Sequence, residues 1–86
     1  MQVTVLSPER VVFQGEADSL VAPATDGLVG VLRRHAPFMT LLGEGVLTVR
    51  QGAQGTRFRV AGGFLQVVGG SGDIVRVVAD QVSDFS

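Results

Sequence analysis

Hydrophobic and polar residues alternate along several short segments of this chain. In Leu47–Arg50 and again in Phe58–Val60, every second residue is apolar, which is the pattern of a strand with one face on a core. The segment between them, Gln51–Thr56, contains turn-forming glycines. The two runs are therefore expected to form a hairpin.

Similar short runs recur along the chain at intervals of about 8 to 12 residues, with turn residues between them, a spacing typical of β-sandwiches and barrels. Two runs, Phe64–Val68 and Val75–Ala79, are more uniformly apolar, as strands covered on both faces would be. Helical spacing is not sustained over any useful length. Strands are expected at Gln2–Leu6, Val11–Gly15, Ser19–Ala22, Leu28–Leu32, Phe38–Leu41, Val46–Arg50, Arg57–Val60, Phe64–Val68 and Ile74–Val78.

Length and charge narrow the class of protein. A chain of 86 residues supports one core, so residues 1–86 are expected to form a single domain. Seven arginines, no lysine and eight acidic residues give a formal net charge of −1, which offers no electrostatic reason to expect nucleic acid as a partner. Val60–Gly72 is too short and glycine-rich to cross a bilayer, and no signal peptide follows Met1. A cytosolic protein is expected.

Candidate chemistry is sparse. His35 is the only imidazole and there is no cysteine, so a nucleophilic triad would need His35 with a serine, and a zinc site lacks ligands. Glu16 and Asp18 could share a strand face, but they read more simply as solvated side chains. The glycine-rich segment 69–73 lacks the lysine of a phosphate-binding loop. No catalytic residue, metal, nucleotide or other cofactor is predicted.

Four segments together change this picture. Leu6–Gly15, Ala24–Pro37, Val60–Val67 and Val77–Asp80 occur in an order and spacing that resemble the N-terminal domain of the epsilon subunit of bacterial F-type ATP synthases. The resemblance spans nearly the whole chain. It implies an all-β fold, a flattened β-sandwich of about ten mostly antiparallel strands.

The resemblance also implies two contact surfaces, one for the gamma subunit and one for the c ring. The gamma-facing residues would be His35, Pro37, Phe38, Met39, Thr40 and Leu42. The ring-facing residues would be Asp26, Gly27, Leu28 and Arg33. Strand alternation places Phe38 and Thr40 on one face and Met39 and Leu41 on the other, so only one set can reach a partner. Phe38→Asp is expected to cost about 2 kcal/mol or more of gamma binding.

Two departures from the family's pattern bear on these contacts. Leu28 stands where many members carry an acidic residue, and Arg33-Arg34-His35 replaces a Pro-x-His sequence.

Many members also continue into two helices that inhibit rotation and can bind ATP. Inhibition of rotation and ATP binding are therefore both expected to be absent from this sequence.

The function implied is that of a noncatalytic rotor subunit. It would bind gamma and the c ring, couple proton-driven rotation to ATP synthesis, and lie peripherally at the cytoplasmic face of the bacterial inner membrane without inserting. One alternative is a small ligand-binding or hydrolytic β-sandwich that uses His35 in a deep pocket. Another is an adaptor of the same fold outside the ATP synthase.

Overall fold

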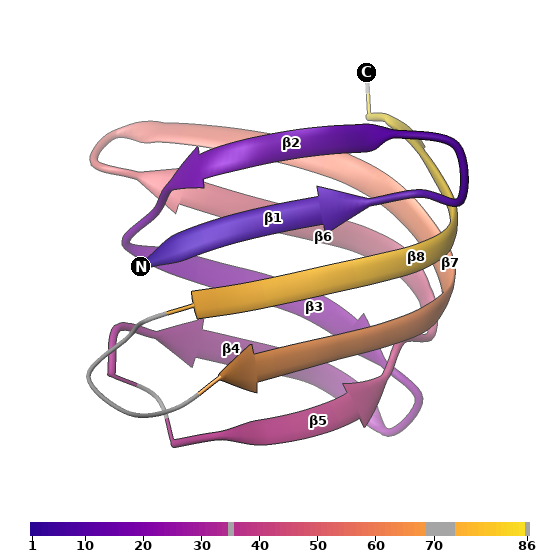
Figure 1. Ribbon diagram of the computed structural model, residues 1–86, viewed down its shortest axis with the longest axis horizontal. Coiled ribbons are helices and arrows are strands. Elements are labelled where there is room, and N and C mark those ends of the chain that lie inside the picture. Colours follow the sequence, from indigo (N-terminus) through magenta and orange to yellow (C-terminus); the bar gives the residue numbers. More distant parts are fainter. Residues whose placement is uncertain (35, 69–73, 86) are drawn as a thin grey trace.

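The computed structural model describes residues 1–34, 36–68 and 74–85, and every regular element in these residues is a strand. The first six strands agree with the expected ones to within two residues at either end. Figure 1 shows their arrangement. The strands are β1 (Gln2–Leu6), β2 (Val11–Glu16), β3 (Ser19–Ala24), β4 (Gly27–Leu32), β5 (Phe38–Leu41), β6 (Glu44–Gln51), β7 (Gln54–Val68) and β8 (Ile74–Asp84).

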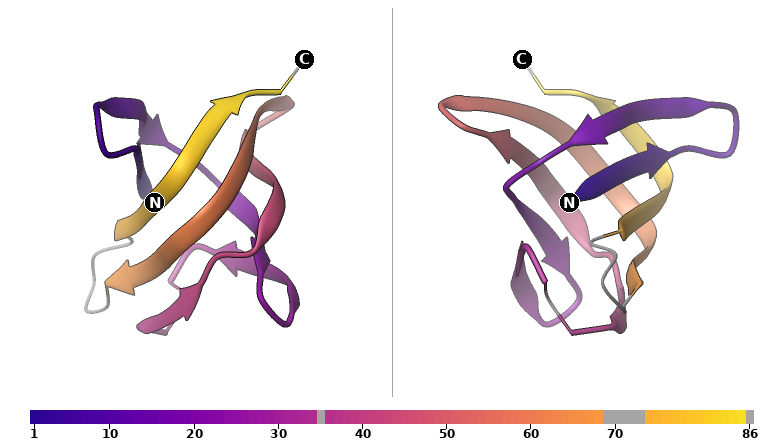
Figure 2. Two further views of the ribbon diagram at one scale, coloured as in Figure 1. Left: turned by 90° about the vertical axis from the view of Figure 1, so that its right-hand side faces the viewer. Right: turned by 60° about the vertical axis from the view of Figure 1, so that its left-hand side comes forward.

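The strands form two layers that share their two longest members. The first layer has the order β2-β1-β8-β7-β5, and the second has the order β8-β7-β6-β3-β4. Strands β7 and β8 curve from one layer into the other, around the right-hand side of Figure 1 and across both views of Figure 2. The described residues form eight strands, two of which belong to both layers, and the expected all-β sandwich is confirmed. Strands β1 and β8 run parallel, and the other described pairs are antiparallel.

A pair of glycines bends β7 where it passes between the layers. Gly62 and Gly63 have φ angles of 73° and 104°, which side chains rarely adopt. A Cβ on Gly63 would lie 2.0 Å from the carbonyl oxygen of Val78 on β8. Opposite the glycines, the Leu42 N–H donates to the Gly63 carbonyl (2.9 Å) and the Gly62 N–H to the Gly43 carbonyl (3.3 Å). The chain between β5 and β6 thus follows the bend.

The bend also changes which residues of β7 face the core. Phe58 and Val60 are buried before the glycines, and Leu65 and Val67 are buried after them. The two-residue alternation is therefore displaced by one position at the bend. Because such a displacement reverses the direction of every later side chain, Phe64 points outward instead of into the core.

Two expectations about β7 and β8 are wrong. Arg57–Val60 and Phe64–Val68 are one strand, because the glycines bend the chain without ending its pairing with β8. Phe64–Val68 and Val75–Ala79 are not covered on both faces within the chain, since only alternate residues are buried. The apolar residues that alternate with the buried ones, such as Phe64 and Val78, face outward.

The core lies between the two layers and consists mainly of valine and leucine. The expected hairpin is confirmed, because β6 pairs with β7 from Gln51–Gln54 to Glu44–Ala61 and sends Leu47 and Phe58 inward. The described residues include no helix that could span a membrane. The fully buried side chains from the two layers are Val3, Val5, Leu20, Val31, Leu47, Val60, Leu65, Val75 and Val77.

Candidate functional site

A row of apolar side chains crosses the outer face of the first layer. Pairing places Leu41, Phe64, Val78, Leu6 and Val11 opposite one another on β5, β7, β8, β1 and β2. Leu41 is 63% exposed and Val11 is 51% exposed, and the three residues between them are partly buried. The row therefore presents apolar surface across all five strands of the layer.

One further residue widens this row. Met39 lies two residues before Leu41 on β5 and is 61% exposed. Polar side chains, Gln66 and Arg76, follow Met39 in the next row of the sheet. An exposed apolar surface with polar neighbours is typical of a protein interface. We call the five residues of the row together with Met39 the outer apolar face.

The structure decides which side of β5 can meet a partner. Phe38 packs against the core and Thr40 pairs with buried Leu65, so both point inward. Leu42 is 4% exposed and belongs to the core. Leu42 therefore has little side-chain surface left for a contact, and Phe38 and Thr40 are partly buried. Met39, with Leu41, faces outward instead.

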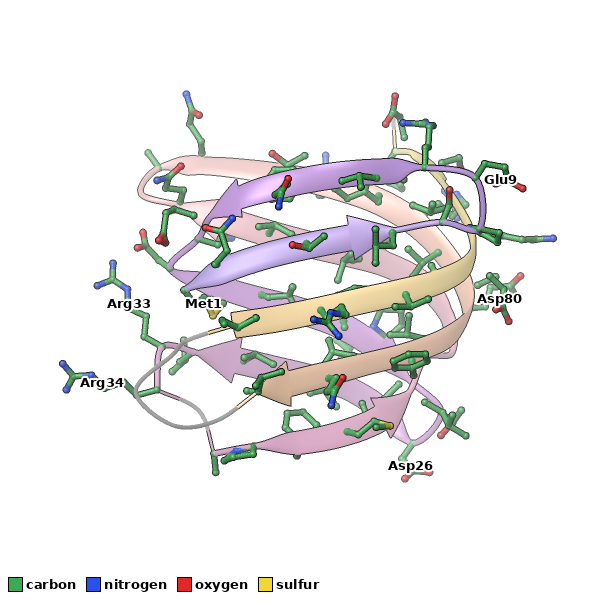
Figure 3. The ribbon with its side chains drawn as sticks, in the orientation of Figure 1. Met1, Glu9, Asp26, Arg33, Arg34 and Asp80 are labelled. Atoms are coloured by element: carbon green, nitrogen blue, oxygen red, sulfur yellow. The ribbon has the colours of Figure 1, made fainter. Side chains whose placement is uncertain are left out.

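The segment that connects β4 to β5 lies at one end of the sandwich. His35 falls outside the described residues, and Pro37 beside it is exposed. Arg34 has a φ of 62°, in the left-handed region. Figure 3 shows Arg33 and Arg34 projecting from this end. The position of Pro37 thus remains compatible with a partner contact.

Arg33 forms an ion pair with Asp18 beside the turn between β6 and β7. The Arg33 guanidinium donates to one carboxylate oxygen of Asp18, and the backbone N–H of Gly52 donates to the other at 2.7 Å. The hydrogen bond from Gly52, followed by that from Arg33, lowers the pKa of Asp18 below its ordinary value. Asp18 therefore ties together the end of β4 and the β6–β7 turn.

The ring-facing residues expected from the sequence are divided between the two ends of β4. Asp26 lies in the turn between β3 and β4, Gly27 begins β4, and Leu28 follows with 75% of its surface exposed. Arg33 lies beyond the other end of β4, so the structure does not bring it to the same surface. Figure 3 shows Asp26 at the end of the sandwich that also carries Glu9 and Asp80.

The described residues offer little to catalysis. They contain no group of three or more His, Cys, Asp or Glu arranged to hold a metal ion. A hollow of about 270 Å³ lies on the second layer, between Glu44 on β6, Arg59 on β7 and Gln81 on β8. It is an open depression with neither a histidine nor a pair of acids among its lining residues. The hydrolytic alternative gains no support from it.

The sequence analysis missed four members of the outer apolar face: Leu6, Val11, Phe64 and Val78. Each looks like a core residue, because it lies in an apolar run. Only the pairing of the strands shows that they share one outer face. The sequence did offer a signal for Leu6. Val3 and Val5 alternate in β1 and occupy its inner face, so the next residue, Leu6, points outward.

Taken together, these observations define a small all-β sandwich domain with an exposed apolar face on one layer. The model of the ATP synthase delta/epsilon chain β-sandwich domain matches residues 1–84, and the chain therefore belongs to this family. The resemblance found in the sequence is confirmed.

Individual relatives agree with this assignment. The ATP synthase epsilon chain of Caulobacter vibrioides is 46% identical over 67 residues, which is 78% of this chain and 78% of the relative. The ATP synthase epsilon chain of Leptospira borgpetersenii serovar Hardjo-bovis is 45% identical over 67 residues, which is 78% of this chain and 53% of the relative. The chain thus spans about half the length of several curated relatives that it matches.

Solved structures of similar fold come from mitochondrial ATP synthases. A chain in the Euglena gracilis OSCP/F1/c-ring structure superposes with a TM-score of 0.85 at 20% identity, covering 95% of this chain and 51% of that one. A chain in the Tetrahymena thermophila central stalk/c-ring structure gives 0.77 at 17% identity, covering 96% and 65%. These matches support the fold.

Proposed function

We propose that this chain is the sandwich part of a noncatalytic central-stalk subunit of an F-type ATP synthase. It binds the gamma subunit through the outer apolar face and meets the c ring with the end that carries Asp26, Gly27 and Leu28. Family membership and the names of the similar structures support this role. The gamma contact is assigned to the outer apolar face because its apolar side chains run across all five strands of the first layer.

A rotor subunit must transmit torque without deforming. In this chain β7 and β8 belong to both layers, so the two layers cannot slide past each other without breaking strand pairing. Rotation of the ring would then reach gamma through one rigid body. In this role the subunit couples proton-driven rotation to ATP synthesis and lies peripherally at the cytoplasmic face of the bacterial inner membrane.

The size of the gamma contact can be judged from Leu41. Its side chain is 63% exposed. Burying this exposed part against gamma would contribute about 1–2 kcal/mol to binding. An aspartate there would lose this contribution and place an unpaired charge in the interface. Leu41→Asp is therefore expected to weaken gamma binding by about tenfold or more, which corresponds to at least 1.4 kcal/mol.

The experiment measures binding of the gamma subunit from the same genome by titration calorimetry. Leu32→Asp is the matched control, because Leu32 is a strand leucine with 66% exposure on the second layer. We expect Leu32→Asp to leave the affinity within about twofold of the parent protein, since a surface change away from the contact has little effect. Equal losses from both variants, or no loss from Leu41→Asp, would refute the assignment of this face.

A further inference from the structure

The outer face of the second layer carries three arginines on adjacent strands. Arg50 lies on β6, and Arg57 and Arg59 lie on β7. All three are exposed, and they are three of the seven arginines in a chain whose net charge is −1. Nearly half of the arginines of the protein therefore lie on this face. We call these three residues the arginine patch.

Contacts within the layer hold the arginine patch in place. The Nη1 atom of Arg50 lies 3.5 Å from the point that a Cβ on Gly55 would occupy, so its side chain lies across β7. The guanidinium carbons of Arg57 and Arg59 lie 4.6 Å and 5.1 Å from the centre of the Phe85 ring, within the range of cation–π attraction. Side chains that are already oriented lose less entropy when a ligand binds.

A hollow opens inside the patch. It has a volume of about 380 Å³ and is lined by Thr48, Arg50, Gly55 and Arg57. Gly55 has no side chain, and the Arg50 side chain lies over it. Two guanidinium groups and a hydroxyl therefore surround one depression, a combination that suits the oxygen atoms of an anion.

No carboxylate neutralises the patch within the part of the chain that the structure describes. The guanidinium groups of Arg50, Arg57 and Arg59 form no ion pair there. Glu44 lies on the same face but in the row beyond Arg59, opposite Ala61. Three like charges on one small surface repel each other, and a partner of opposite charge would relieve the repulsion and be attracted over a distance.

We propose that the arginine patch docks an acidic segment of a partner protein. Arg57 and Arg59 are two residues apart on one strand, which separates their Cα atoms by about 7 Å, and Arg50 extends the patch onto β6. This spread fits several carboxylates along a polypeptide better than it fits one compact phosphate. The patch lies on the opposite layer from the outer apolar face, so both surfaces can be occupied at once.

The test measures binding of a fluorescent hexaglutamate peptide by anisotropy. Each of Arg50→Gln, Arg57→Gln and Arg59→Gln is expected to weaken binding by about two- to fivefold, the effect of losing one exposed ion pair. Arg76→Gln is the matched control, because Arg76 is an exposed strand arginine on the first layer. We expect it to change the affinity by less than about twofold. Added salt should weaken binding to the parent protein.

Three outcomes would overturn the proposal. The first is the absence of saturable binding at low ionic strength. The second is an equal loss from Arg76→Gln, which would show attraction to any arginine. The third is displacement of the peptide by pyrophosphate at a lower concentration than by a second, unlabelled hexaglutamate, which would identify the hollow as a phosphate site. Far-ultraviolet circular dichroism of each variant separates these outcomes from loss of fold.

Discussion

Replacing Gly63 by alanine tests the feature on which both layers depend. Gly63 has a φ of 104° and lies where β7 bends beside β8. A methyl group there would meet the Val78 carbonyl oxygen at 2.0 Å and the Val78 carbonyl carbon at 2.9 Å. These atoms belong to the backbone, so the contact cannot be relieved by rotating a side chain. Either the bend or the pairing with β8 must change.

The expected cost follows from these two effects. An alanine held at an unfavourable φ costs about 1–3 kcal/mol. Moving β8 away would weaken at least one hydrogen bond of the ladder, which adds about 1 kcal/mol. The sum, about 2–4 kcal/mol, is a large part of the total stability, which should be roughly 4–13 kcal/mol for a chain of 86 residues.

Urea unfolding followed by circular dichroism measures this change. With a slope of about 1 kcal/mol per molar urea, the midpoint of Gly63→Ala should fall by about 2 M or more. Gly30→Ala is the control, because a Cβ at Gly30 would meet nothing within 4 Å and its φ is not positive. Its stability should change by no more than about 0.5 kcal/mol. A Gly63→Ala protein as stable as the control would show that the bend does not need a glycine.

Two further predictions concern Phe38 and Asp18. Phe38→Asp should lower the free energy of unfolding by more than Leu41→Asp does, because Phe38 packs against the core and Leu41 is exposed; equal urea midpoints would contradict this. The contacts of Asp18 lower its pKa in the folded state, so they stabilise the fold above the unfolded pKa, about 3.9, and this contribution is lost as the pH falls through the folded value. Asp18→Asn should therefore flatten the decline in stability on acidification, and an unchanged profile would show that Asp18 makes no net contribution.

The local strand pattern of this chain is readable from sequence, but its faces are not. The bounds of β1 to β6 agree closely with those expected because turn residues separate these strands from one another. On β5, however, Phe38 and Met39 are both apolar, so alternation alone cannot say which of them is buried. That choice is made by the pairing of β5 with β7, a contact between segments distant in sequence.

The bend of β7 was unreadable for a related reason. Gly62-Gly63 resembles a turn between two strands, and alternation continued through it from Val60 would place Phe64 in the core. Whether a glycine pair ends a strand or bends it depends on the neighbouring strands, and here both β5–β6 and β8 continue alongside. The outer apolar face is thus a product of tertiary pairing, although every residue in it is visible in the sequence.

The same bend explains how so short a chain can present two different surfaces. Before the glycines, the outward residues of β7 include Arg57 and Arg59, and after them they include Phe64 and Gln66. One strand therefore contributes the arginine patch to one layer and part of the outer apolar face to the other. Since both surfaces are fixed to the same two strands, a partner bound at one cannot move relative to a partner bound at the other unless β7 or β8 deforms. The proposed torque-transmitting role requires this rigid relation between the two surfaces.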